Sequence, residues 1–119
     1  MVGLTEIQAT IVGDKATKEY TFVVDTGATY LGLPLEEIEL LGLQRSRGII
    51  RVMTVSGVVE ADAYFANGEL NGELFGAMLI PTAEPLLGYE LLQNLRYKVN
   101  PVTHEIERVP DWERHPPYL

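Results

Sequence analysis

The chain has 119 residues, of which 46% are hydrophobic and 22% charged, a composition typical of one ordinary globular domain. It contains no cysteine, which excludes disulfides, zinc–thiolate sites and cysteine nucleophiles. Its net charge of −8 argues against nucleic acid or an anionic membrane as a partner, because phosphate groups are bound by clustered Lys and Arg.

Short alternating segments separated by glycine and proline run through most of the chain and predict a mainly-β fold. Residues 5–25 are predicted to form a hairpin that turns at 13–15, because apolar side chains recur at every second position on both sides of that turn. The second strand of this hairpin ends at Asp25. Residues 29–33 are expected to continue in extended form.

A short helix is predicted over residues 34–41, where leucine and isoleucine recur at helical spacing. Pro34 suits the first helical position, N1, because its φ angle is already helical and it needs no amide hydrogen there. Gly42 can end the helix in the left-handed conformation that glycine adopts without strain.

Residues 49–66 alternate again and predict a second, longer hairpin, interrupted at Ser56-Gly57. Two Asn-Gly pairs, at 67–68 and 71–72, then predict two turns. A further strand is expected over 73–81.

The last third of the chain begins with two leucines and a glycine at 86–88, followed by a second short helix over 89–95 and a hairpin over 97–109. We place one domain at 1–109 and an irregular, proline-containing tail at 110–119. No apolar run approaches the roughly 20 residues of a membrane helix, and no basic segment followed by an apolar one marks a secretory leader at the start. We therefore expect a cytoplasmic protein without a membrane partner.

The most informative segment is 22–28, where an apolar strand delivers a single carboxylate, Asp25, followed by Thr26 and Gly27. A carboxylate at the end of a buried strand is costly unless hydrogen bonds compensate for the lost water. The Thr26 hydroxyl can supply such a bond, and Gly27, which has no Cβ, lets backbone and substrate approach closely. The alternative is a strand-to-turn junction without chemistry.

Two motifs carry a resemblance to a known family. Val23-Val24-Asp25-Thr26-Gly27 resembles the catalytic loop of aspartic proteases, and Leu86-Leu87-Gly88 before a short helix resembles the family's second signature. The chain length points to the retropepsin-like (clan AA) branch, and the chain looks more like its single-domain prokaryotic-type members than its viral ones. The resemblance covers residues 5–109. It implies a mainly-β acid-protease half-barrel with one or two short helices and one domain per chain.

By this resemblance Asp25 is the catalytic residue of an aspartic endopeptidase, which needs two carboxylates around one water. The sequence contains no second Asp-Thr-Gly, and Asp14, Asp62 and Asp111 are better explained as solvated. The second carboxylate is therefore expected from a second chain, in a C2 homodimer with both Asp25 side chains at the axis. The substrate would be a peptide or protein, and no cofactor is implied.

The resemblance also implies roles for the residues around Asp25. Thr26 would hydrogen-bond to the other chain's loop, and Gly27 would leave room for the peptide. Leu87 and Gly88 would support the loop from a neighbouring strand. The hairpin at 49–66 would be a flap that closes over bound peptide, with an ordinary surface hairpin as the alternative. The residues implied to bind substrate are Ala28, Thr29, Ser56 and Gly57.

Three points qualify the implied function. Viral members pair an acidic residue after the catalytic loop with an Arg after the second glycine, whereas this chain has Thr29 or Tyr30, and Tyr89, at those places. What holds the dimer together is therefore open. No metal is expected, because His104 and His115 stand apart and no cysteine accompanies them. The alternative function is a non-catalytic peptide-binding or regulatory dimer with the same fold, which digestion of a peptide library would distinguish.

Overall fold

The computed structural model describes residues 4–109, and the tail predicted at 110–119 lies outside the described residues. Strands dominate this part of the chain, so the mainly-β prediction is confirmed. None of the described helices is long and apolar enough to cross a membrane. The elements are β1 (Glu6–Val12), β2 (Thr17–Asp25), β3 (Leu31–Leu33), α1 (Leu35–Leu41), β4 (Gln44–Thr54), β5 (Gly57–Leu70), β6 (Glu73–Pro81), β7 (Leu86–Gly88), α2 (Tyr89–Asn94), β8 (Tyr97–Val99) and β9 (Ile106–Arg108).

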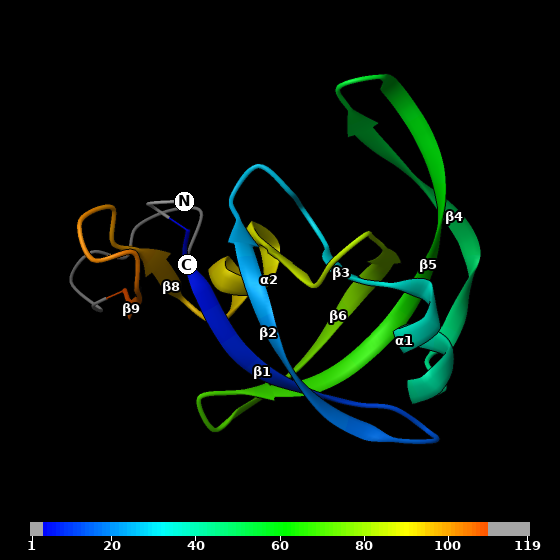
Figure 1. Ribbon diagram of the computed structural model, residues 1–119, viewed down its shortest axis with the longest axis horizontal. Helices are drawn as coiled ribbons and strands as arrows, with labels where there is room; N and C mark the ends of the chain where they lie inside the picture. Colours follow the sequence, from blue (N-terminus) through cyan, green and yellow to red (C-terminus); the bar gives the residue numbers. More distant parts are fainter. Residues whose placement is uncertain (1–3, 110–119) are drawn as a thin grey trace.

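The main sheet closes into a barrel-like ring (Figure 1). Its hydrogen-bonded order is β1-β2-β7-β3-β6-β5, and β5 pairs back onto β1 through Ile11↔Gly68 and the neighbouring positions. Closure removes the exposed edges that an open sheet would present. Among the described strands, β4 pairs only with β5 and so stands outside the ring.

Alternating side chains of the ring strands fill the barrel. The hairpin predicted over residues 5–25 is confirmed as β1–β2, with a register that runs from Glu6↔Val23 to Val12↔Thr17. Buried and exposed positions alternate in both strands, as expected when one face of a sheet meets the core and the other meets water. The largest fully buried side chains are Phe22, Ile11, Leu31, Leu33, Ile38, Leu41, Leu70, Leu79 and Leu87.

The predicted helix at 34–41 is present as α1, but it begins one residue later. Pro34 (φ −56°, ψ 144°) is its N-cap rather than its N1 residue, because its ψ angle is extended and Leu35 is the first helical residue. Gly42 ends α1 in the left-handed conformation, at φ 70°, as predicted.

A hydrogen-bonded triad ties α1 to β2. Glu37 of α1 accepts bonds from the Lys18 ammonium and from the Tyr20 hydroxyl, both at 2.7 Å. Burial raises the pKa of Tyr20, so its hydroxyl keeps the proton that it donates. The hydrogen bonds from Lys18 and Tyr20 lower the pKa of Glu37, which holds the carboxylate in its charged form.

The long hairpin is larger than predicted, since β4 begins at Gln44 and β5 runs to Leu70. Thr54 pairs with Gly57, so the two-residue tip is 55–56, and Gly57 (φ 116°) is already the first residue of β5. The interruption predicted at Ser56-Gly57 is therefore correct to within one residue.

One of the two predicted Asn-Gly turns is wrong. Asn71 and Gly72 form the β5–β6 turn with φ angles of 50° and 83°, but Asn67 and Gly68 lie inside β5. Gly68 is required by packing instead, because a Cβ there would lie 2.3 Å from the Thr10 carbonyl oxygen of β1.

The last third of the described chain follows the prediction closely. The strand predicted at 73–81 is β6, and Leu86–Gly88 forms β7. The second helix, α2, ends at Asn94, one residue earlier than predicted. The final hairpin is present as β8 and β9, which pair with each other in a separate two-stranded sheet.

Candidate active site

Asp25 is the last residue of β2, and it is exposed. β2 runs parallel to β7, in a register that sets Val24 beside Leu87 and Asp25 beside Gly88. The two sequence motifs are therefore adjacent in space. Leu87 is fully buried and Val24 packs against the core, so apolar side chains anchor both strands up to the carboxylate.

The loop after Asp25 is a tight turn held by two local hydrogen bonds. The Gly27 N–H donates to Asp25 Oδ1 at 2.9 Å, and the Ala28 N–H donates to the Asp25 carbonyl at 3.0 Å. The first of these bonds orients the carboxylate. Thr26 is exposed, and its hydroxyl has no hydrogen-bond partner within residues 4–109.

Gly88 lets β7 pass closely against this loop. A Cβ at Gly88 would lie 2.5 Å from both the carbonyl carbon and the carbonyl oxygen of Thr29. Directly after it, the Tyr89 N–H donates to the Ala28 carbonyl at 2.9 Å, and the Glu90 N–H donates to the Thr29 carbonyl at 3.4 Å. The loop therefore supplies acceptors for the first amides of α2, which have no partner inside the helix.

Two backbone contacts at the end of β2 were missed by the sequence analysis. The Val24 N–H donates to the Thr5 carbonyl at 2.8 Å, and the Val23 N–H donates to the Pro85 carbonyl at 3.1 Å. Both acceptors lie far from β2 in the sequence, so no local pattern marks them. Residues 29–30, expected to be extended, belong to the loop after Asp25, since β3 begins only at Leu31.

The other described aspartates have separate surroundings. Asp14 lies in the β1–β2 turn, at the opposite end of β2 from Asp25. Asp62 is in β5, where it forms an ion pair with Arg45 at 2.6 Å. No cluster of three or more potential metal ligands occurs within residues 4–109. Asp111 lies outside the described residues.

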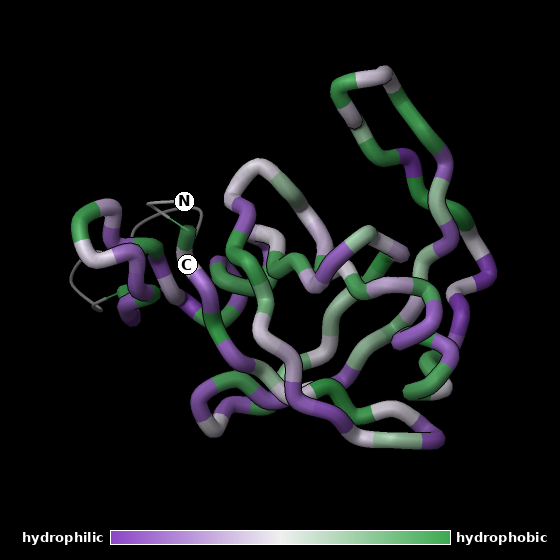
Figure 2. Tube along the Cα trace, viewed as in Figure 1, coloured by the Kyte–Doolittle hydropathy of each residue, from purple (hydrophilic) through white to green (hydrophobic). Residues whose placement is uncertain are grey.

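The predicted flap residues, Ser56 and Gly57, lie on the hairpin that projects from the barrel, apart from the Asp25 loop. Figure 1 shows this hairpin and the loop after β2 rising from the same end of the barrel. Hydrophobic residues predominate along the hairpin in Figure 2. Its exposed apolar side chains are Ile49, Met53, Val55, Val58 and Val59. Exposed apolar surface of this kind is usually covered when a partner or ligand binds.

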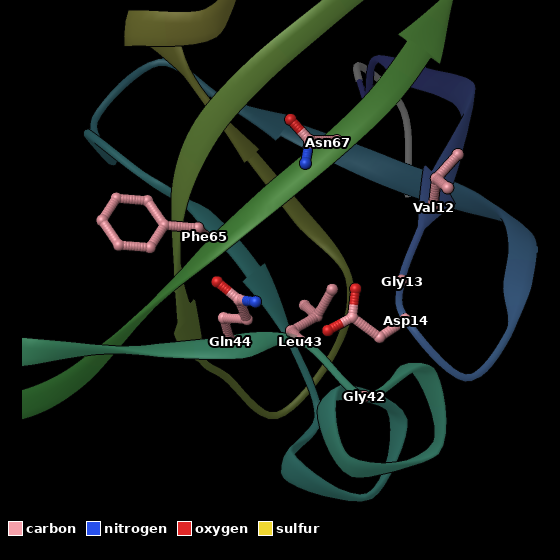
Figure 3. A pocket seen from close by; sticks show the side chains of 8 residues that line it. All are labelled: Val12, Gly13, Asp14, Gly42, Leu43, Gln44, Phe65 and Asn67. Carbon is pink, nitrogen blue, oxygen red and sulfur yellow. The ribbon is translucent and has the colours of Figure 1, made fainter.

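A small pocket of about 120 Å³ lies elsewhere, between the β1–β2 turn, the end of α1 and the start of β4 (Figure 3). Its lining includes Asp14, Gly42, Gln44 and Phe65. Because Asp14 and Asp25 lie at opposite ends of β2, this pocket is not part of the Asp25 site.

Comparisons with known proteins agree with the fold and with the Asp-Thr-Gly motif of this chain. A family profile described as aspartyl protease matches residues 7–91. The structure of EIAV protease complexed with the inhibitor HBY-793 is 19% identical, with a TM-score of 0.68 over 84% of this chain and 95% of that one. The solution structure of Simian Foamy Virus (mac) protease is 20% identical, with a TM-score of 0.58 over 81% of this chain and 100% of that one. No curated protein matches. The retropepsin-like fold predicted from the sequence is therefore confirmed.

Proposed function

Since this chain belongs to the aspartyl protease family, we propose that it is an aspartic endopeptidase that works as a homodimer, with one Asp25 from each copy in the active site. The observation that carries the proposal is the placement of Asp25. It is exposed, at the end of a strand whose side chains pack into the core, and within residues 4–109 the Gly27 N–H is the one donor to its carboxylate. One chain supplies one such loop. A second copy, related by a two-fold axis beside Asp25, would supply the other.

The paired carboxylates would act as base and acid on one water. The ionised Asp25 takes a proton from the water while the water oxygen attacks the peptide carbonyl carbon. The protonated Asp25 of the other copy gives its proton to the carbonyl oxygen. When the resulting diol collapses, the carbon–nitrogen bond breaks as the newly protonated Asp25 gives its proton to the leaving nitrogen and the partner's carboxylate takes a proton from one diol hydroxyl. The pair returns to its singly protonated state, so the reaction consumes only peptide and water.

Hydrogen bonds among the described residues use some polar groups of the loop and leave others for the proposed contacts with the partner chain and substrate. The carbonyls of Ala28 and Thr29 already accept bonds from α2, and the Ala28 N–H is used within the loop. Within residues 4–109 the Gly27 carbonyl and the Thr29 N–H have no backbone hydrogen bond, and we assign them to the peptide backbone. The Thr26 hydroxyl is assigned to the partner's loop. Gly88 and Leu87 hold this loop in place.

The hairpin supplies the other wall of the proposed site. Ser56 and Gly57 at its tip would close over the peptide, which would cover the apolar side chains that are exposed in the single chain. Cytoplasmic location and a domain that spans residues 1–109 remain predictions from the sequence.

The decisive experiment is peptide-library digestion by wild type, Asp25→Asn and the matched control Asp14→Asn. The control makes the same chemical change at the other end of β2. Asp25→Asn should lose cleavage at least 1,000-fold, roughly the loss seen when a catalytic group is removed, whereas Asp14→Asn should cut like wild type. Sedimentation at rising concentration should show a dimer whose fraction follows specific activity. Full activity in Asp25→Asn, or in a monomer, would refute the mechanism, and peptide binding without cleavage by wild type would favour the binding-module alternative.

A further inference from the structure

Asn71 and Gly72, which form the β5–β6 turn, are a pair whose own groups can react with each other. When the Gly72 backbone nitrogen attacks Cγ of Asn71, a nitrogen–carbon bond forms, the bond from Cγ to the side-chain nitrogen breaks, and ammonia leaves with the N–H proton. Water then opens the cyclic imide at one of its two carbonyls. The products are aspartate and isoaspartate, in which the backbone runs through the side-chain carbon. Glycine favours the attack because it has no Cβ beside its nitrogen.

The turn leaves these groups free to react. Asn71 and Gly72 are both exposed, and their φ angles of 50° and 83° fit a two-residue type I′ turn closed by the Leu70↔Glu73 pair. Within residues 4–109 neither the Asn71 side chain nor the Gly72 N–H has a hydrogen-bond partner. A Cβ at Gly72 would have no heavy atom within 4 Å, so the nitrogen is open to approach. Any rearrangement that the attack requires is confined to a hairpin tip, which opens at little cost.

The other Asn-Gly pair, Asn67-Gly68, has the same composition but is held inside β5. Gly68 pairs with Ile11 of β1 on one side and with Phe75 of β6 on the other. Its surroundings are crowded, since a Cβ there would lie 2.3 Å from the Thr10 carbonyl oxygen. Attack by the Gly68 nitrogen would require both ladders to separate, which approaches global unfolding.

The two remaining asparagines are blocked by the residue that follows each of them. Asn94 precedes Leu95, whose side chain hinders approach to the backbone nitrogen. Asn100 precedes Pro101, which has no N–H to lose. The Asn100 side chain is also held in place, because its oxygen accepts bonds from the backbone amides of residues 102 and 103.

The β5–β6 turn also carries a contact between the barrel and the β8–β9 hairpin. Glu73, directly after Gly72, forms an ion pair with Arg108 of β9. The Tyr97 hydroxyl of β8 lies 3.4 Å from the same carboxylate oxygen. Because β8 and β9 pair only with each other among the described strands, such side-chain contacts help to hold their hairpin against the barrel.

We infer that Asn71 is a site of spontaneous deamidation, and that its isoaspartyl product loosens the contact between the β5–β6 turn and the β8–β9 hairpin. Isoaspartate adds one carbon–carbon bond, about 1.5 Å, to the backbone. A two-residue turn has no spare residue to absorb that length, so the Leu70↔Glu73 pair must shift and carry the Glu73 carboxylate away from Arg108. Aspartate adds a charge but leaves the length of the turn unchanged. The inference does not rest on the proposed peptidase.

The first test measures where the reaction occurs. The chain is incubated at mildly alkaline pH in water enriched in oxygen-18, so that each imide opened during the incubation gains a heavy oxygen, and the modified residues are located by peptide mass spectrometry. In the folded protein Asn71 should convert at least about 100-fold faster than Asn67, since local opening is far easier at a turn tip than in a central strand. In concentrated urea the two should convert at similar rates.

Comparable rates at Asn67 and Asn71 in the folded protein would overturn the assignment, as would faster conversion at Asn94 or Asn100. A difference between Asn67 and Asn71 that persists in urea would overturn the structural explanation, because the fold would not be its cause.

The second test measures the consequence for β8 and β9. The acidic fraction of the aged protein, separated by ion exchange, contains both products, whereas Asn71→Asp supplies the aspartyl form alone. Loss of an exposed ion pair is worth up to about fivefold in local opening. The aged fraction should therefore contain a population whose β8 and β9 amides exchange up to about fivefold faster, and Asn71→Asp should exchange like wild type. Equal exchange in all three samples would overturn the proposed loosening. Failure of the chain to cleave peptides would refute the proposed peptidase alone.

Discussion

Gly88→Ala should both destabilise the fold and displace the Asp25 loop. The added Cβ would lie 2.5 Å from the carbonyl carbon and oxygen of Thr29, about 1 Å inside ordinary van der Waals contact. The obstacle is backbone, which cannot rotate away like a side chain, so β7 or the loop must shift by about 1 Å. Overpacking of this kind costs about 1–3 kcal/mol, and we expect the upper end of that range.

The same shift should also lower the proposed peptidase activity. Misplacing a catalytic group by about 1 Å can cost about 100-fold in rate, so kcat/KM for peptide cleavage should fall by about that factor. Urea denaturation and peptide hydrolysis, both at one fixed protein concentration, measure the two effects. The matched control is Gly76→Ala in β6, where the nearest atom to an added Cβ is Asn67 Oδ1 at 3.5 Å. Gly88→Ala with the stability and rate of Gly76→Ala would refute the argument.

Two further predictions concern stability. Glu37→Gln should lower the unfolding free energy near neutral pH by up to about 1 kcal/mol. The bonds from Lys18 and Tyr20 lower the Glu37 pKa, so its contribution is complete above the ordinary value of 4.5 and is lost as the pH falls through the folded-state pKa. The gap between the two urea curves should therefore narrow as the pH falls below 4.5, and a gap that does not narrow would contradict the assignment. Arg96→Gly should raise the midpoint of thermal unfolding. Arg96 follows α2 with φ at 63°, a conformation that costs a non-glycine residue about 1 kcal/mol. A lower midpoint would count against this explanation.

Turns, helix ends and loops that are determined by neighbouring residues could be predicted from the sequence. The turn at 13–15 stands between two alternating runs, and Gly42 follows a helical repeat directly. The Asp25 loop and the Leu86–Gly88 strand were recognised as motifs, and the parallel β2–β7 pairing that joins them follows from the fold that those motifs imply. In each of these cases the residues that decide the local conformation are neighbours in the chain.

The errors arose where contacts between distant segments decide the conformation. Asn67-Gly68 has the composition of a hairpin turn, yet it lies in β5 because Gly68 is where β1 crosses closely against that strand. A bulge in β4 at 46–48 has no clear sequence signal either. It follows from the register of β4 on both sides, since the Gln44↔Phe65 and Ile49↔Asp62 pairings leave more residues on β4 than on β5.

The electrostatics of Asp25 also depend on something outside one chain. The sequence suggests a carboxylate at the end of a buried strand, where loss of water is costly, but in the single chain this carboxylate is exposed. The desolvation cost would therefore arise only when a second copy covers the loop. Two carboxylates in contact repel each other unless they share a proton, and the shared proton removes most of that repulsion. The step that completes the proposed site would thus also create the ionised base and the protonated acid that the proposed cleavage requires. On this proposal the single chain would keep Asp25 in water and would acquire the active pair only in the dimer.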